Sequence, residues 1–271
     1  MSTQLRSYKD YFLESRKHYV GNKPDLDFFY GKGVMELDIS QFGGAYMGNI
    51  QILSTIVDKY FSKRKPTDNP KLIKYEKFDY IKPYINNISS IIIPYLEENL
   101  YGCNLYVDKV YTWRNVEHNR KEDSWIWHFD NNPNEIYKVI IYLSDVDKHK
   151  SPFQYLVDDD GFGKVIRGTR QGIDEWKKIL SRVSDDEVMN LIKKDYKINS
   201  MIGKKGSITV FNNNLIHRAT IPEKNNHRDV VVLRLKPTIK KIQYVDKKYT
   251  TSWETSGVVN KNPNIIGDGN E

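Results

Sequence analysis

The stretch Trp127-His128-Phe129-Asp130, followed by the run Tyr137-Lys138-Val139-Ile140-Ile141-Tyr142-Leu143, decides how this chain of 271 residues folds. Side chains two apart on a β-strand point to the same side, so His128 and Asp130 can face one point while Phe129 packs behind them. The run that follows is rich in the β-branched and aromatic residues that strands favour. We therefore expect a histidine–aspartate pair on one strand and a buried strand directly after it.

A second histidine, His217, follows the short apolar run 206–211 and the turn Asn212-Asn213-Asn214. It lies 89 residues after His128 (217 − 128), so the fold must bring the chain back to the first pair. Closed or sandwiched antiparallel sheets do this routinely. Two imidazoles and one carboxylate can bind Fe(II) on one face and leave the other positions open for reactants. Arg228, 11 residues beyond His217 (228 − 217), offers a planar fork suited to a carboxylate.

Context distinguishes this doublet from a chance match. With six histidines and 35 acidic residues, chance alone gives about 0.8 His-x-acid pairs, and His227-Arg228-Asp229 is another. His128, however, follows the aromatic run Trp125-Ile126-Trp127 and precedes a turn-rich segment, 131–134, and then a predicted strand. We therefore interpret His128, and not His227, as the metal-binding histidine.

At these residues the chain resembles the 2-oxoglutarate and Fe(II)-dependent oxygenases, most closely their phytanoyl-CoA dioxygenase-like branch, over about 106–235. The resemblance implies that His128, Asp130 and His217 bind the iron. It also implies a mainly β chain with flanking helices around a double-stranded β-helix of the jelly-roll or cupin type. The implied cofactors are Fe(II) and 2-oxoglutarate. The implied reaction is hydroxylation of a small-molecule or carrier-attached metabolite with dioxygen, while 2-oxoglutarate is decarboxylated to succinate.

The same resemblance assigns the cosubstrate site. Arg228 would hold the distal carboxylate of 2-oxoglutarate, and Tyr142 would line the cosubstrate pocket as a looser match. Relatives often carry Ser or Thr two residues after the distal histidine, where this chain has Ala219. Thr220 follows, but in a strand it would face the other way. This departure leaves open a cupin-like zinc or iron enzyme that does not use 2-oxoglutarate.

Three residues before the doublet are candidates for substrate contact. Arg114, Trp113 and Trp125 are expected near the metal, where they could touch the substrate. For each aromatic residue, packing in the core is the alternative. No Ser/His/Asp or Cys/His arrangement indicates a protein nucleophile.

The formal net charge of +7 and a pI near 9.1 raise the question of a nucleic-acid partner. A demethylase of the AlkB type is one alternative, because Arg228 and Arg234 lie six apart, similar to the paired arginines of that group. The basic runs 63–65 and 236–248 do not interleave aromatics with cations as nucleic-acid grooves do, so we expect solvated loops and no nucleic-acid partner. A third alternative is a non-catalytic jelly-roll protein that binds a sugar or another protein.

The domain organisation is predicted as one oxygenase domain over 1–255, with a helical part at 1–100, a jelly-roll core at 104–236 and a flexible tail at 256–271. A helical insertion, 153–205, is expected to interrupt the core. It contains one helix with the apolar residues Ile173, Trp176, Leu180 and Val183, and a capping box at 184–187 that opens another. The insertion would act either as a lid over the site or as helices that only pack on the barrel.

Before the core we expect helices at 4–18, 50–61 and 78–100, the last interrupted at Pro83 and Pro94. The glycine-containing segments 31–33 and 43–44 are expected to be loops.

Composition also indicates the cellular setting. The single Cys103 excludes an intrachain disulfide and a multi-cysteine zinc site. Met1 to Lys9 lacks the apolar core of a signal peptide, and no stretch approaches the ~20 apolar residues of a membrane span. We expect a cytoplasmic protein with no membrane partner, whose partners are dioxygen and a small-molecule substrate.

Overall fold

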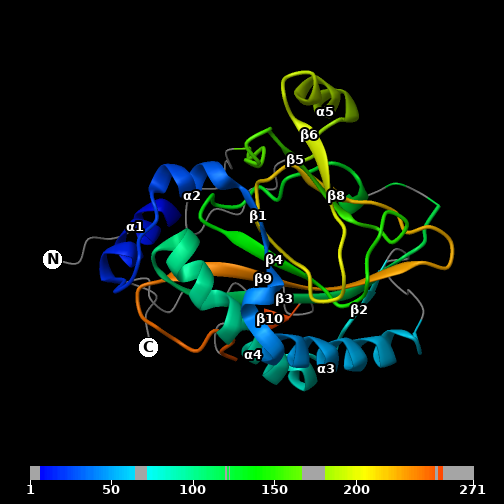
Figure 1. Cartoon of the computed structure of the whole chain (residues 1–271), viewed down its shortest axis with the longest axis horizontal. Coiled ribbons are helices and arrows are strands. Elements are labelled where there is room, and N and C mark those ends of the chain that lie inside the picture. Colours follow the sequence, from blue (N-terminus) through cyan, green and yellow to red (C-terminus); the bar gives the residue numbers. More distant parts are fainter. Residues whose placement is uncertain are drawn as a thin grey trace.

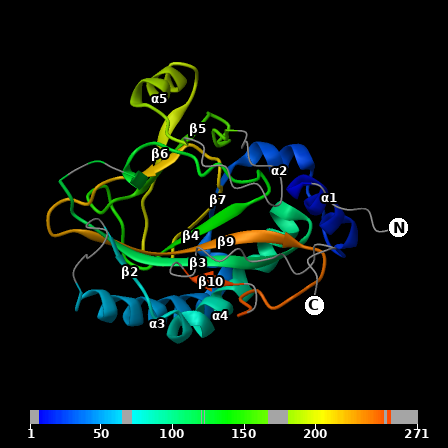
Figure 2. The same cartoon turned by 180° about the vertical axis from the view of Figure 1, so that it is seen from behind.

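A computed structural model describes residues 7–64, 72–119, 121, 123–166, 181–247 and 250–252 of the chain. Two sheets face each other, and helices α3 (Gly43–Phe61) and α4 (Phe78–Leu96) lie along the outer side of the larger sheet (Figures 1 and 2). The smaller sheet lies on the side away from these helices.

The larger sheet has seven strands, antiparallel except where β10 runs parallel to β3. Its order is β1 (Val34–Leu37), β7 (Ile208–Asn212), β4 (Tyr137–Tyr142), β9 (His227–Thr238), β3 (Asn104–Val116) and β10 (Thr251–Ser252), with β2 (Leu72–Lys74) paired to β3. The strand expected from Leu105 to Trp113 is therefore present and longer at both ends, and β1 was not expected.

The smaller sheet has the order β6 (Lys197–Met201), β5 (Phe153–Val157) and β8 (His217–Ala219). His128 extends it by an antiparallel bridge to His217. Along the chain the segments alternate between the two sheets, from β3 to the His128 bridge, β4, β5 and β6, β7, β8 and β9. This is the strand order of a double-stranded β-helix, so the predicted fold class is confirmed.

The larger sheet is apolar on both faces, and alternation along its strands separates the two faces. On β4, Val139 and Ile141 belong to the core shared with α3 and α4, whereas Ile140 and Tyr142 face the smaller sheet. We call the latter side the barrel face. On β9 it carries Val230 and Val232, together with the residues two before and two after them.

The remaining helical elements are α1 (Tyr8–His18), α2 (Leu26–Lys32), η1 (Ile39–Phe42), the π-turn η2 (Glu97–Tyr101), η3 (Asp123–Trp125) and α5 (Asp185–Ile192). Helix α1 confirms the predicted N-terminal helix, and Ser7 caps it by accepting from the amide of Asp10. The predicted capping box of α5 is present, because Ser184 and Glu187 each bond the other's backbone amide.

Two predictions about the N-terminal half are wrong. Gly31 lies inside α2, and Gly43 and Gly44 begin α3, so these glycines do not lie in loops. Only Gly33 ends a helix, with a φ of 62° that favours glycine.

Helix α4 is also not interrupted at Pro83 or Pro94. A proline in a helix interior costs about 3 kcal/mol, whereas each fully buried Ile or Leu contributes about 1.5–3 kcal/mol. The apolar stripe of α4 against the core outweighs the two prolines; it consists of Ile81, Ile85, Ile88, Ile92, Ile93 and Leu96.

The segment 153–205 is not a helical insertion throughout. It begins with β5 and contains β6, which pair with each other in the smaller sheet, and α5 lies between them. Ile173, Trp176 and Leu180, expected in a helix, and the tail 256–271 lie outside the described residues, whereas Val183 is buried beside Val188 of α5. In the described part of the chain, no helix has both the length and the apolar character needed to span a bilayer.

Candidate metal centre

The structure brings His128, Asp130 and His217 together. Two backbone hydrogen bonds join the histidines, from His128 N to His217 O at 3.0 Å and from His217 N to His128 O at 2.9 Å. The amide of Asp130 donates to Asn213 O, in the turn before β8. One ligand atom from each of the three side chains lies within 4.8 Å of the other two. The group therefore fits a single metal ion.

Both imidazoles are oriented by the backbone. The Nδ1 atoms of His128 and His217 lie 2.8 Å from the carbonyl oxygens of Ile126 and Leu215, each two residues earlier. A carbonyl oxygen only accepts, so Nδ1 must carry the proton and Nε2 keeps its lone pair. Metal-binding histidines commonly donate their other ring N–H in this way, which fixes the tautomer and the ring orientation.

Asp130 is held by a lysine that the sequence analysis did not single out. Lys138 Nζ on β4 lies 2.5 Å from Asp130 Oδ2. Side-chain exposures of 21% for Asp130 and 17% for Lys138 show that the pair reaches solvent at its edge. A carboxylate has two oxygens, so Lys138 can bind one while a metal takes the other. A lone lysine in an otherwise apolar strand was the signal in the sequence.

The protonation states suit metal binding. Burial, and then the neighbouring His128, lower the pKa of His217 to about 3, so its imidazole is neutral at neutral pH. Burial also lowers the pKa of His128. For Asp130, burial acts to raise the pKa, but Lys138 and the two imidazoles outweigh it and hold the pKa well below its usual range. Two neutral imidazoles and an ionised carboxylate are the forms that bind a divalent cation.

Arg228 is a buried cation whose fork is incompletely satisfied. Its residue is 3% exposed, and neither Nε nor Nη1 has a hydrogen-bond partner among the described residues. The third nitrogen, Nη2, is 3.5 Å from Asn115 Oδ1, a long contact. Burying a charge with unpaired donors is costly unless an anion joins it. The two open N–H groups fit one carboxylate of 2-oxoglutarate.

Tyr142 lies beside this arginine. The Arg228 guanidinium carbon is 5.9 Å from the centre of the Tyr142 ring. The Tyr142 hydroxyl donates to Met201 O at 2.8 Å and accepts from Phe153 N at 3.0 Å. The ring is therefore fixed between the two sheets, next to the predicted cosubstrate anchor. Ala219 is buried on β8, and the Thr220 hydroxyl has no partner among the described residues.

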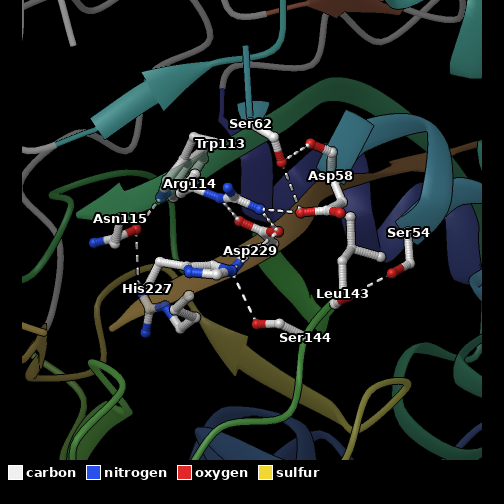
Figure 3. A network of polar contacts seen from close by, with 11 residues as sticks. Ser54, Asp58, Ser62, Trp113, Arg114, Asn115, Leu143, Ser144, His227 and Asp229 are labelled. Atoms are coloured by element: carbon white, nitrogen blue, oxygen red, sulfur yellow. Dashed lines mark hydrogen bonds and ion pairs between the residues drawn. The ribbon is translucent and has the colours of Figure 1, made fainter. Parts of the chain in front are cut away.

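Arg114 does not lie at the metal (Figure 3). Its Nε and Nη2 each lie 2.7 Å from an oxygen of Asp229, and Nη2 also lies 2.6 Å from Asp58 Oδ1 on α3. Asp229 is adjacent to Arg228 on β9, so its side chain points to the opposite face of the sheet. Arg114 therefore joins the sheet to a helix, and its predicted contact with substrate is not supported.

The two tryptophans differ in their placement. Trp113 packs with Tyr111 at the core cluster of the barrel face, and its Nε1 donates to Asn115 Oδ1 at 2.6 Å. It thus lies on the same side of the sheet as Arg228. Trp125 is 1% exposed and packs its ring 5.5 Å from that of His118, as the core-packing alternative required.

The second His-x-Asp doublet also gathers acidic and imidazole groups. His227, Asp229 and Asp58 could offer ligand atoms within 4.8 Å of one another. Both oxygens of Asp229 are already held by Arg114, however, and a cation at this place would be repelled by that guanidinium (Figure 3). This doublet serves an ion-pair network.

No protein-family model matches this chain, and no curated protein matches it. Solved structures similar to it include HygX from Streptomyces hygroscopicus with nickel and 2-oxoglutarate bound, at 12% identity and a TM-score of 0.48, covering 82% of this chain and 94% of that one. They also include EctD from S. alaskensis in its apo form, at 12% identity and a TM-score of 0.49, covering 84% and 86%. A third is the epimerase SnoN in complex with Fe3+, alpha-ketoglutarate and nogalamycin RO, at 10% identity and a TM-score of 0.46, covering 78% and 81%. The fold of this chain follows from its strand order independently of these likenesses, and its candidate site follows from its own side chains.

Proposed function

We propose that this chain is an Fe(II)- and 2-oxoglutarate-dependent dioxygenase that hydroxylates a small-molecule or carrier-attached metabolite. The observation that carries the proposal is the convergence of His128, Asp130 and His217, with both Nδ1 protons already committed to backbone carbonyls. Two imidazoles and one carboxylate on one face, with the remaining positions open, are typical of non-haem Fe(II) oxygenases.

The cosubstrate is proposed from the second feature, the open donors of Arg228. An arginine fork binds a carboxylate through two parallel hydrogen bonds, and Arg228 offers two buried N–H groups. Fe(II) with 2-oxoglutarate supplies oxidising chemistry in which dioxygen hydroxylates a substrate C–H bond and converts 2-oxoglutarate to succinate and carbon dioxide.

The remaining tasks belong to the chain's own side chains. Lys138 holds one oxygen of Asp130 and so limits the rotation of this ligand. The rings of Phe153 and Phe211 lie 5.3 and 5.1 Å from that of His217 and form an apolar wall that excludes water. Arg228 fixes the far end of the cosubstrate, which orients its near end toward the metal.

The proposal is tested by adding Fe(II) and 2-oxoglutarate to the protein without oxygen. We expect the weak visible charge-transfer band of the metal–cosubstrate chelate in the wild-type protein. His217→Ala should abolish the band because one of three protein ligands is lost. His18→Ala, at an exposed position on α1, is the matched control and should keep it.

Turnover is measured next, as succinate release during untargeted screening of metabolites with oxygen present. A protein that forms the band and releases succinate only with certain metabolites is a dioxygenase. The absence of the band at saturating Fe(II) and 2-oxoglutarate would refute the proposal, and metal binding without 2-oxoglutarate would favour the cupin-like alternative raised by Ala219.

The AlkB-type alternative gains no support from the second arginine. Nε and Nη2 of Arg234 are both bound to Asp108, so this side chain is committed within the protein. Binding to oligonucleotides that weakens steeply with added salt would still favour a nucleic-acid substrate.

A further inference from the structure

Three cations lie side by side on the barrel face of the larger sheet. In the strand register, Lys138 of β4 is directly opposite Arg234 of β9, and Arg234 is directly opposite Lys109 of β3. Paired residues of antiparallel strands share a face, and this is the face of Ile140 and Tyr142, two and four residues beyond Lys138. We call these three residues the cation row.

Like charges placed directly opposite each other destabilise a sheet, so the row needs anions nearby. Asp108 supplies one, at the irregular register position next to Lys109. It binds Arg234 through Nε at 2.8 Å and through Nη2, and it lies 3.1 Å from Nζ of Lys236. Burial and the charge of Arg234 lower the pKa of Lys109 to about 8, as expected where positive charge is crowded.

The second anion, Asp130, is shared with the metal. Its oxygen Oδ2 contacts Lys138, and the same carboxylate is one of the three proposed metal ligands. When a metal and 2-oxoglutarate are bound, the two charges of the metal and the charge of Arg228 are balanced by Asp130 and the two carboxylates of the cosubstrate. Four cations near the row then share one remaining carboxylate, Asp108, among the described residues.

We propose that Lys138, with Arg234 and Lys109 beside it, binds a negatively charged group of the substrate next to the metal. This inference rests on the proposed function and names the substrate class, a small molecule that carries a phosphate, sulfate or carboxylate. Lys138 is the specificity-determining residue, because Arg234 is already held by Asp108 and Lys138 adjoins the metal ligand. Its partial exposure of 17% leaves its ammonium within reach of a bound molecule.

The row and the cosubstrate anchor lie on opposite sides of the barrel face. Arg228 and Arg234 are six residues apart on β9, which separates their Cα atoms by roughly 20 Å at about 3.3 Å per residue. The anchor and the row can therefore hold two different anions at the same time.

The test titrates inorganic sulfate into protein saturated with Ni(II) and 2-oxoglutarate and follows binding by calorimetry. We expect Lys138→Met to weaken sulfate binding tenfold or more and Lys138→Arg to keep it within about threefold of the wild type. Lys204→Met is the matched control, because Lys204 is a lysine with an 84% exposed side chain on the same protein and its loss changes the net charge equally. It should bind sulfate as the wild type does.

Unchanged sulfate affinity in Lys138→Met, equal weakening in Lys204→Met, or no binding to the wild type would each overturn the inference. Lys138→Gln, together with a melting curve for every variant, separates loss of the charge from loss of the fold. The anaerobic Fe(II)–2-oxoglutarate band reports the proposed function separately, so a protein can show the band and fail the sulfate test, or the reverse. In the substrate screen, anionic metabolites should stimulate succinate release and Lys138→Met should raise their KM more than it lowers kcat.

Discussion

Arg228 and Arg234 lie on the same face of the same strand, yet their surroundings are opposite. Arg234 binds both oxygens of Asp108, a residue that is 1% exposed. Arg228 is similarly buried but has two N–H groups without a partner in the described part of the chain. Natural proteins pair nearly all buried polar groups, so an exception at a conspicuous place calls for an explanation.

The difference separates a structural ion pair from a ligand anchor. The guanidinium of Arg234 is neutralised within the protein, and it helps to hold β9 against β3. The guanidinium of Arg228 keeps its best donors unused, and the protein bears that cost for an anion that arrives from outside. The notebook-like symmetry of two arginines six residues apart therefore has no functional counterpart.

Removing the paired arginine should have the largest effect on folding. We expect Arg234→Met to lower the free energy of unfolding by about 3–5 kcal/mol, because Asp108 is left as a buried charge with Lys236 as its main partner. Chemical denaturation measures this change. Arg64→Met, which breaks an exposed ion pair with Glu76, should change the same quantity by less than about 1 kcal/mol.

Removing the unpaired arginine should affect cosubstrate binding and leave the fold intact. We expect Arg228→Met to weaken 2-oxoglutarate binding roughly 100-fold, equivalent to about 3 kcal/mol, because the carboxylate loses a bidentate partner. Its free energy of unfolding should not fall, since an unpaired buried charge is removed. Titration of the visible band gives the affinity. A variant that binds 2-oxoglutarate normally, or that unfolds as readily as Arg234→Met, would contradict the distinction between the two arginines.

Acid should reveal the paired arginine only. For Asp108, burial acts to raise the pKa, but Arg234 and Lys236 outweigh it and lower the pKa from 3.8 to about 2. A depressed pKa in the folded state stabilises the protein above the unfolded value, near pH 4, and this contribution is lost as the pH falls toward 2. We expect a loss of about 2 kcal/mol over that range. Stability measured against pH should show a shallower acid limb in Asp108→Asn, and an equally steep limb would contradict the assignment.

The strands around the site could be predicted from sequence, and so could the grouping of the three metal-ligand candidates. The apolar run at 137–143 and the spacing of His128 and Asp130 are local patterns, and both are present as β4 and the bridge to His217. The capping box at Ser184 and Glu187 is equally local. Such patterns depend on residues two to four apart, which the backbone geometry alone relates.

Errors arose where long-range packing decides. The burial of α4 outweighs the local preference of Pro83 and Pro94 to end a helix. Alternation shows that Trp113 and Arg114 face opposite sides of a strand, but not which side is the barrel. The register of β3 against β9 places Arg114 opposite Asp229 and turns it toward α3.

The sequence alone determined the types of strand and helix, the identity of the metal-ligand candidates and the presence of an arginine suited to a carboxylate, because these depend on residue chemistry and short spacing. Only the tertiary structure decided that Arg228 has open donors while Arg234 does not, that Lys138 holds Asp130, and that three cations share one row. These properties depend on which strands lie next to one another, and strand pairing is fixed by the packing of residues far apart in the chain.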